Sequence, residues 1–477
     1  MVTTPTQRAI QEACLEDRTV RIRNTREVAH DGDPQRPTGP GRQLGKRGNL
    51  CHRLQQFSVR VDSAARQRVV LAANGLFRAK GNLVKIVDLT EFYSERGGGV
   101  RSHLDTKNQL SCQLGHDSVV IAPGPRSERI ELQKGSDGRG SQTVIRLAGP
   151  STPYDPTYHL LTAPRALRKA IEAEKPDVLE LHSPYLAGLF GTRVPRSLAP
   201  VRTFVWHADF IDTYVRPALE KRVSCTLTDR AVAPLWAWVR SLSASVDATF
   251  VSSRQQRAKL LDHGCERVIL VPFGVDRDVF HCDKPRDFRL REELTEGREG
   301  PLLLAVGRFA IEKRWDTLVE IAERAYAVKP FTLWVFGDGP ERKVLETAAA
   351  RLPFLRIGTF EKSRERLADI YRASDGILHA CPYETFGLGL AEAVACGVPV
   401  VVPDQGGAYE QARDGSSFVY RSLDPAAGAS ALLELLAEDP EELRDLAREN
   451  ALDVPSFAMY MKRMLAYYTE FSRGSRP

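Results

Sequence analysis

Long apolar runs are missing from the 477-residue sequence. No stretch reaches the roughly 20 consecutive apolar residues that a bilayer-spanning helix needs, and the first residues lack the apolar core that secretory signals carry. The sequence therefore predicts neither a membrane-spanning segment nor a signal peptide. We expect a cytoplasmic protein, with peripheral contact to the inner face of a membrane left open.

Paired cysteines are also missing. The eight cysteines include no C-x-x-C pair and no group with metal-ligand spacing, which argues against a zinc ribbon or a disulfide scaffold. The first predicted strand is followed by a glycine-rich turn, but this turn is not the G-x-G-x-x-G fingerprint of dinucleotide-binding domains. We therefore expect reduced thiols and a ligand other than a dinucleotide.

The body of the chain has no basic excess. The formal charge of the whole chain is +6, and residues 1–80 carry 15 Lys and Arg against 7 Asp and Glu, so the remaining residues are slightly acidic. Nucleic-acid binding by the body is not expected, because it depends on a basic surface. Residues 1–80 are interpreted as a basic, mostly disordered extension; contact with nucleic acid or an anionic membrane is the less favoured alternative.

Strands and helices alternate along the rest of the chain. The length suggests two or three domains, and the alternation predicts parallel, doubly wound α/β sheets. Strands are expected at 83–89, 118–122, 177–182, 201–207, 248–252, 268–271, 301–308, 331–336, 355–358, 377–381 and 398–402. The predicted domains are an N-terminal α/β domain at 81–275, a connection at 276–300, a C-terminal α/β domain at 301–455 and a final helix at 456–477.

The stretch 376–410 carries the strongest functional signal. An apolar strand stops at Pro382, residues 385–387 form a tight loop, and a short apolar helix runs to Cys396 before the next strand. This order aims the free N–H groups and the positive dipole end of the helix at one point. A phosphate group is the ligand that such a helix tip favours.

Two carboxylates flank that helix tip, Glu384 and Glu392, with seven residues between them. A carboxylate beside a phosphate repels it, but accepts hydrogen bonds from neighbouring hydroxyl groups, as sugars and riboses require. The inferred ligand is therefore a nucleotide sugar. The alternative is an ordinary buried strand, turn and helix with solvated glutamates.

The surrounding pattern, P-x-E-x-F-G-L-x-x-x-E-A-x-A-x-G-x-P-V-V, resembles the retaining glycosyltransferases of family 4, which carry an E-x7-E signature. The resemblance implies a GT-B fold, in which two Rossmann-like doubly wound domains face each other across a cleft and the last helix crosses back to the N-terminal domain. It also implies that Glu384 contacts the donor hexose and Glu392 the nucleotide ribose. Phe386, Gly387 and Leu388 are then expected to line the donor site.

Arg308 and Lys313 leave the end of the strand that begins at Leu302 and lie five residues apart. An arginine can hold two phosphate oxygens at once, and a lysine supplies a mobile point charge. The two residues match the G-R-x-x-x-E-K element of the resembled family, where both bind the donor diphosphate. Taken alone, two cations in a loop are more often simply solvated.

Glycines mark two further turns. Gly337 and Asp338 belong to a G-x-G-P turn that the resemblance places beside the donor, although an ordinary turn explains it nearly as well. Gly98 and Gly99 match the glycine pair that the family carries in its first turn, where the bare backbone approaches the donor phosphate and the acceptor.

Histidines follow several strands. His207 ends the strand at 201–207, and family members often carry a histidine there, near the donor sugar and the acceptor hydroxyl. We assign it a catalytic role together with Arg308, Lys313 and Glu384. His182 is a weaker candidate, and His103, His116 and His379 are expected to be structural.

No essential metal and no cofactor are expected. The D-x-D pairs Asp31-x-Asp33 and Asp276-x-Asp278 lie in the extension and in the connection, away from the inferred phosphate site. No carboxylate is an obvious nucleophile, and the resemblance implies a front-face route in which a leaving phosphate oxygen takes the proton of the acceptor.

The sequence thus predicts a retaining hexosyltransferase. It would move a hexose from a UDP- or GDP-linked donor to a saccharide or lipid-linked acceptor. The alternatives are a sugar-nucleotide epimerase of the same fold and a binding protein without catalysis. The presence of all four residues Arg308, Lys313, Glu384 and Glu392 argues against the binding protein.

Overall fold

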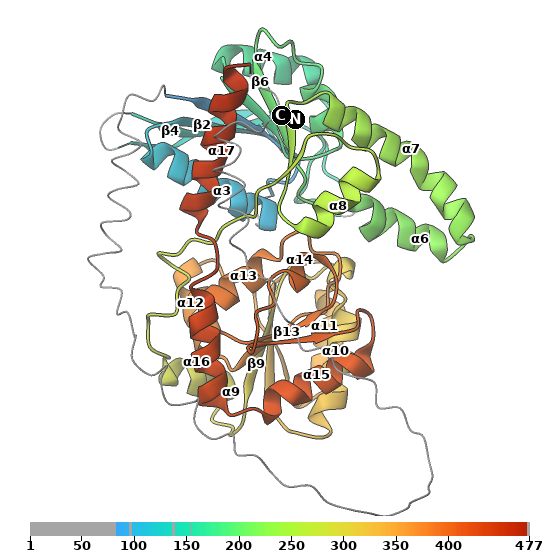
Figure 1. Ribbon diagram of the computed structural model, residues 1–477, viewed down its shortest axis with the longest axis vertical. Helices are drawn as coiled ribbons and strands as arrows, with labels where there is room; N and C mark the ends of the chain where they lie inside the picture. The colour runs from blue at the N-terminus through green and yellow to red at the C-terminus, as the bar shows by residue number, and fades with distance from the viewer. Residues whose placement is uncertain (1–82, 95–97, 136–138, 154, 475–477) are drawn as a thin grey trace, which may run out of the picture. The chain divides into compact units, whose positions relative to one another are not determined.

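The computed structural model describes residues 83–94, 98–135, 139–153 and 155–474. The interpretation of residues 1–80 as a basic extension, and the Asp31-x-Asp33 pair within it, lie outside these residues. The described residues build two parallel α/β sheets (Figure 1), so the predicted fold class is confirmed. Every helix among the described residues is too short or too polar to traverse a bilayer.

The first sheet has eight strands in the order β3-β4-β2-β1-β5-β6-β7-β8, and only the β3–β4 pair is antiparallel. The order reverses between β1 and β5, and ligands of doubly wound sheets bind at the carboxyl ends of the strands beside such a reversal. The strands are β1 (Lys85–Leu89), β2 (Asp117–Gly124), β3 (Glu128–Lys134), β4 (Ser141–Ala148), β5 (Val178–Leu181), β6 (Val201–Val205), β7 (Ala248–Val251) and β8 (Val268–Leu270).

Seven helical segments belong to this part of the chain. Most of them bury apolar residues against the strands, whereas α6 buries none and the buried face of α3 is mostly polar. The segments are α3 (Gly99–Gln113), α4 (Pro164–Glu174), α5 (Leu186–Gly191), η1 (Ile211–Val215), α6 (Arg216–Glu220), α7 (Cys225–Ala244) and α8 (Arg254–Asp262).

The second sheet has six parallel strands in the order β11-β10-β9-β12-β13-β14. In chain order this is the 3-2-1-4-5-6 arrangement of a Rossmann fold, with its reversal between β9 and β12. The strands are β9 (Leu302–Val306), β10 (Thr332–Phe336), β11 (Leu355–Ile357), β12 (Gly376–Leu378), β13 (Val400–Pro403) and β14 (Ser417–Tyr420).

Helices cover both faces of this sheet and extend beyond it. The polar connection expected at 276–300 contains one of them, α9, which the sequence analysis did not predict. The segments are α9 (Phe288–Thr295), η2 (Ile311–Lys313), α10 (Trp315–Tyr326), α11 (Arg342–Arg351), α12 (Arg364–Ala373), α13 (Leu388–Ala395), α14 (Gly406–Tyr409), α15 (Pro425–Ala437), α16 (Pro440–Ala451) and α17 (Phe457–Ser472).

The last helix, α17, packs against α3 of the first sheet domain (Figure 1). The hydroxyl of Tyr468 donates to Oε2 of Glu180 at 2.6 Å, and the hydroxyl of Tyr460 lies 3.2 Å from Nε2 of His103. Both tyrosines are buried. The end of the chain therefore completes the core of its first α/β domain.

Candidate functional site

The loop between β12 and α13 carries Glu384, and the loop after β9 carries Lys313. Nζ of Lys313 donates to Oε1 of Glu384 at 2.5 Å. Nε2 of His379, which follows β12, lies 3.3 Å from the same carboxylate oxygen. The reversal of strand order between β9 and β12 thus brings a cation and a carboxylate together that are 71 residues apart.

This pair is charged. Burial alone would raise the pKa of Glu384, but the positive charge of Lys313 and the neighbouring His379 lower it well below its usual range. Burial likewise opposes the charge of Lys313, but the Glu384 carboxylate raises the pKa of the lysine. A lysine ammonium and a glutamate carboxylate therefore face each other at the end of the sheet.

Arg308 lies on the same loop as Lys313. Its guanidinium donates to Oε1 of Glu312 at 2.9 Å and contacts the hydroxyl of Tyr158, which comes from the first α/β domain. Trp315 holds the backbone in place by donating from Nε1 to the carbonyl oxygen of Arg308 at 3.1 Å. Burial disfavours the charged form of Arg308, but the Glu312 carboxylate raises the pKa of its guanidinium group, so Arg308 stays charged.

The tip of α13 is built from Phe386, Gly387 and Leu388. Gly387 precedes the helix with φ +81°, in the left-handed region that favours glycine. The backbone N–H groups of this first turn receive no side-chain cap. Gln411 donates to the carbonyl oxygen of Phe386 at 2.9 Å and so fixes the loop. The helix tip therefore presents donors that suit an anionic oxygen.

Glu392 lies on α13 and is buried. Its Oε1 is 3.9 Å from the guanidinium of Arg364, which also lies 3.5 Å from Asp276 and donates to Thr106 at 2.9 Å. Burial raises the pKa of Glu392 to about 7, with Arg364 opposing the rise and Asp276 adding to it. Arg364 thus joins the helix to the connection and to α3.

The G-x-G-P turn supports the Arg308 loop. The N–H of Phe309 donates to the carbonyl oxygen of Asp338 at 2.9 Å. A Cβ atom on Gly337 would lie 1.9 Å from the carbonyl oxygen of Gly307, so only glycine fits there. The Asp338 carboxylate accepts from Gly339 and from Arg342. The turn therefore sets the path of the backbone that carries Arg308.

Gly98 and Gly99 open α3. A Cβ atom on Gly98 would lie 3.6 Å from the hydroxyl of Tyr158, the same hydroxyl that Arg308 contacts. Nothing lies within 4 Å of a Cβ atom on Gly99. The structure therefore brings Gly98 to the Arg308 side of the site and leaves open space at Gly99.

His207 meets the loop of Glu384 through its main chain. Its carbonyl oxygen accepts from Thr385 Oγ1 at 2.7 Å, and Ser252 Oγ donates to the carbonyl oxygen of Thr385 at 3.0 Å. The ring Nε2 of His207 lies 2.8 Å from Nδ1 of His182, whose Nε2 lies 2.9 Å from Oδ1 of Asp88. The three side chains form a chain of hydrogen bonds at the reversal between β1 and β5.

A buried lysine ammonium pairs with the Asp88 carboxylate at the end of this chain of hydrogen bonds. Nζ of Lys107 bonds to Oδ1 of Asp88 and lies 2.7 Å from Oε1 of Glu180. Burial opposes the charge of Asp88, but Lys107 and His182 lower its pKa to about 2. Burial lowers the pKa of His207 well below its usual range, and the neighbouring His182 lowers it further.

Two groups of described residues have ligand atoms close enough to hold a metal ion, Asp88 with Glu180 and His182, and Cys381 with His379 and Glu384. In each group a lysine ammonium already occupies the carboxylates: Lys107 in the first and Lys313 in the second. The positive charge that a cation would bring is therefore already present at both places.

Sequence reasoning missed several residues here. His379 was expected to be structural, yet it contacts Glu384. Tyr158, Arg364 and Lys107 were not singled out, and their partners lie far away in sequence. Of these three residues, Lys107 alone had a local signal in the sequence: it is a charged residue on the buried face of α3.

A cavity of about 220 Å³ lies beside this site. Polar and charged side chains from the segment after β6 and from α8 line it, together with the loop that precedes Glu384. The lining residues are Asp209, Asp212, Arg216, Pro217, Glu220, Gln255, Gln256, Lys259, Pro382, Tyr383 and Gln405. Such a lining suits a ligand rich in hydroxyl groups.

Two family models match the chain. Residues 96–279 match the model described as Glycosyltransferase Family 4, and residues 287–453 match the model described as Glycosyl transferases group 1. The matches cover the two α/β domains in turn, and the predicted family is confirmed.

Relatives and solved structures are also similar. A GDP-mannose-dependent alpha-(1-6)-phosphatidylinositol dimannoside mannosyltransferase of Mycobacterium tuberculosis is 28% identical over 371 residues, which are 77% of this chain and 92% of the relative. A GDP-mannose-dependent alpha-mannosyltransferase of Mycolicibacterium smegmatis is 31% identical over 300 residues, 62% of this chain and 73% of the relative.

Among solved structures, sucrose-phosphate synthase from Thermosynechococcus elongatus has a TM-score of 0.65 and 18% identity, over 82% of this chain and all of that one. Anabaena Alr3699/HepE in complex with UDP and glucose has a TM-score of 0.61 and 16% identity, over 81% of this chain and all of that one. At such identities these structures bear on the fold alone.

Proposed function

Since this chain belongs to glycosyltransferase family 4 and is a nucleotide-sugar-dependent hexosyltransferase of the GT-B fold, we propose that it is a retaining mannosyltransferase that uses GDP-mannose. The acceptor is a saccharide or a lipid-linked polyol. One observation carries the proposal: Lys313, Glu384 and the tip of α13 meet at the strand reversal of the second sheet, with Arg308 on the same loop as Lys313. The GDP-mannose dependence of the two relatives supports the choice of donor.

The donor diphosphate takes the positive side of this site. Arg308 and Lys313 contribute two cations, and the first turn of α13 adds uncapped N–H groups. Negative charge grows on the diphosphate as the anomeric C–O bond breaks, and fixed cations and dipoles stabilise that charge without reorganising. This is the largest catalytic contribution that we assign to the chain.

The glutamates take the hydroxyl groups of the donor. Glu384 is ionised and accepts from the hexose, and Lys313 keeps it in place. Glu392 lies on α13, the helix that follows the Glu384 loop, and accepts from the ribose. Phe386, Gly387 and Leu388 lie between the two carboxylates and line the site.

The engagement of the Glu384 carboxylate supports the proposal of retention. Oε1 of Glu384 is already bonded to Lys313 and close to His379, which weakens it as a nucleophile. We propose that the acceptor oxygen attacks the anomeric carbon from the face that the diphosphate leaves. The C–O bond to the phosphate breaks, the new C–O bond forms, and the leaving phosphate oxygen takes the acceptor proton.

His207 orients the hexose and the acceptor hydroxyl. We propose the tautomer in which Asp88 accepts from Nε2–H of His182 and Nδ1 of His182 accepts from Nε2–H of His207. Neutral His207 then keeps its lone pair on Nδ1. Its Nδ1 can accept from a hydroxyl group, which is the role that we assign to it.

The cavity beside Tyr383 is the acceptor site. It adjoins the Glu384 loop, and its lining mixes carboxylates, amides and cations. Because these groups can both donate hydrogen bonds to hydroxyl groups and accept hydrogen bonds from them, the site suits a polyol headgroup or a sugar. We further propose that the reaction requires no metal or cofactor, since Lys313 and Arg308 supply the charge at the leaving group.

Thermal unfolding with GDP-mannose, UDP-glucose or ADP-glucose tests the donor, because a ligand that binds the folded state raises its stability. GDP-mannose is expected to give the largest shift. Incubation with acceptors such as mannose or phosphatidylinositol mannoside, followed by NMR of the product, tests transfer and configuration. Change of the donor sugar without any acceptor would indicate an epimerase instead, and binding without turnover would indicate a protein without catalysis.

A further inference from the structure

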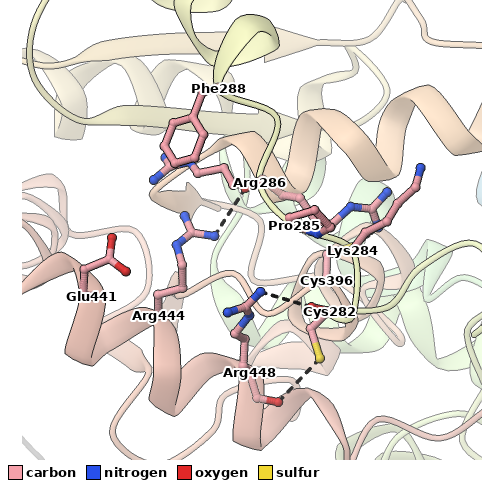
Figure 2. A pocket seen from close by; sticks show the side chains of 10 residues that line it. Cys282, Lys284, Pro285, Arg286, Phe288, Cys396, Glu441, Arg444 and Arg448 are labelled. Atoms are coloured by element: carbon pink, nitrogen blue, oxygen red, sulfur yellow. Dashed lines mark hydrogen bonds between the residues drawn. The ribbon is translucent and has the colours of Figure 1, made fainter. Parts of the chain in front are cut away.

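A second cavity of about 220 Å³ lies at the junction of the connection, α12, α13 and α16. Five of its lining side chains are cations and one is a carboxylate (Figure 2). The lining residues are Cys282, Lys284, Pro285, Arg286, Phe288, Arg372, Cys396, Glu441, Arg444 and Arg448. None of them was singled out by the sequence analysis or used in the proposed reaction.

The positive charges exceed the negative ones around this cavity. Asp375 is 2.6 Å from Arg286 and 3.8 Å from Arg444, and it also serves Arg291 at 2.7 Å. Among the described residues, the guanidinium group of Arg448 donates only to the carbonyl oxygen of Cys282, at 3.5 Å. Burial lowers the pKa of Arg444 to about 10, and the like charge of Arg286 adds to the effect. An anion in the cavity would relieve this repulsion.

The cations are held in fixed positions. Arg372 is 3% exposed, and its two terminal nitrogens bond to His281 and Asp369. Its Nε has no hydrogen-bond partner among the residues that the structure describes. Arg286 and Arg444 are fixed by carbonyl oxygens of Ala373 and Ser374. Fixed guanidinium groups lose little freedom when they bind an oxyanion.

Capping of α12 explains only part of this cluster. Arg286 and Arg444 bond to the carbonyl groups that end α12, as cations often do at a helix C-terminus. Capping does not account for Lys284, which also pairs with Asp369 at 3.1 Å, or for Arg448, and both line the same cavity. Several cations around one partly open cavity are an arrangement that a dianion favours.

We infer that this cavity binds the phosphate group of a phosphomonoester, at a site separate from the donor site. The phosphate takes the guanidinium groups of Arg286, Arg444 and Arg448, with Lys284 at the edge. Phe288 is 72% exposed and lies beside Arg286 (Figure 2), so its ring offers an apolar face to the carbon part of the ligand. Inorganic phosphate shares the charged part of this recognition.

The site is placed to affect the donor helix. Cys396 directly follows α13, whose other end carries Leu388, and Arg372 bonds to its sulfur at 3.8 Å. The segment 282–288 belongs to the connection between the two α/β domains. A bound phosphomonoester therefore contacts both the connection and the far end of the helix that we assign to the donor.

The test measures phosphate binding to the full chain by calorimetry in an Arg308→Gln background, in which binding at the donor site is weakened. Glucose 6-phosphate and inorganic phosphate are the probes, and chloride at matched ionic strength is the control for screening. The pocket variant is Lys284→Gln/Arg448→Gln, which changes two cations outside the α12 cap. The matched control is Arg289→Gln, an exposed cation on α9 that does not line the cavity.

Affinity for both probes is expected to fall about tenfold or more in the pocket variant and to stay unchanged in the control. Phe288→Ala is expected to weaken glucose 6-phosphate and to spare inorganic phosphate. Equal binding by the pocket variant and the control, loss of all binding in Arg308→Gln alone, or an equal response to chloride overturns the proposal. These readouts do not require turnover, so they remain decisive whatever the donor proves to be.

Discussion

The ammonium group of Lys313 donates to Oε1 of Glu384 at 2.5 Å, across the reversal point of the second sheet. Each group favours the charged form of the other, since Glu384 raises the pKa of the lysine and Lys313 lowers the pKa of the glutamate. The pair is therefore formed before any ligand arrives. A cation and an acceptor at fixed positions reduce the reorganisation that a charged transition state demands.

Lys313→Ala is expected to lower kcat by about two orders of magnitude or more, because it removes a cation from the leaving diphosphate. It also leaves the buried Glu384 carboxylate without its cation. Steady-state kinetics with GDP-mannose measure the effect. The control is Lys343→Ala on the exposed face of α11; a similar loss in both variants would contradict the assignment.

Glu392→Gln is expected to stabilise the ligand-free protein at pH 8. The folded pKa of about 7 lies above the usual 4.5, so the native state holds the extra proton between these values and the free energy of unfolding falls as pH rises through them. The fall amounts to about 3 kcal/mol at most. Thermal unfolding should show a gain for the variant at pH 8 and little gain at pH 5. An equal shift at both pH values contradicts this account.

The same glutamate predicts a pH dependence of donor affinity. A carboxylate accepts from a ribose hydroxyl only when ionised, so GDP-mannose should bind more tightly as pH rises through about 7. Calorimetry across this range should find the dependence in the unchanged protein and in Glu346→Gln, an exposed control on α11. It should be absent from Glu392→Gln.

His182→Asn is expected to free Nε2 of His207 from its partner. Both tautomers of His207 then become populated, and kcat falls about tenfold to a hundredfold, whereas the affinity for the donor nucleotide changes little. Nitrogen-15 NMR of the histidine rings reports the tautomer directly. A single unchanged tautomer in the variant would show that Asp88 and His182 do not set it.

Chelation is expected to leave turnover unchanged. The carboxylates that could hold a metal are bonded to Lys107 and Lys313. Initial rates after treatment with EDTA, and after addition of Mg²⁺ or Mn²⁺, measure this. A loss of activity that Mg²⁺ restores contradicts the proposal.

Elements whose sequence signals lie within a few neighbouring residues were predicted from the sequence. The strand, glycine turn and helix at 376–396 were read correctly because the apolar run, Pro382 and Gly387 act within a few residues. The β3–β4 hairpin was missed, because β3 is an exposed edge strand rich in charged residues and lacks the apolar pattern of the buried strands.

Site residues that depend on distant partners could not be found in this way. Lys107 meets Asp88 and Glu180 only after three segments have packed together. His379 is a different case: Glu384 is only five residues away, but the sequence does not show that the loop after Pro382 turns back toward the histidine. Arg308, Lys313, Glu384 and Glu392 were found because their motif spacing survives in the linear chain.

The contact between Tyr468 and Glu180 joins a helix that is synthesised later to a domain that is synthesised earlier. Residues 457–472 leave the ribosome after the first α/β domain, yet they cover the buried charges of that domain. Until that moment Lys107, Asp88 and Glu180 lack their aromatic cover, and the early domain exposes an unfinished apolar surface. A nascent chain halted before Phe457 is thus a natural client for a chaperone.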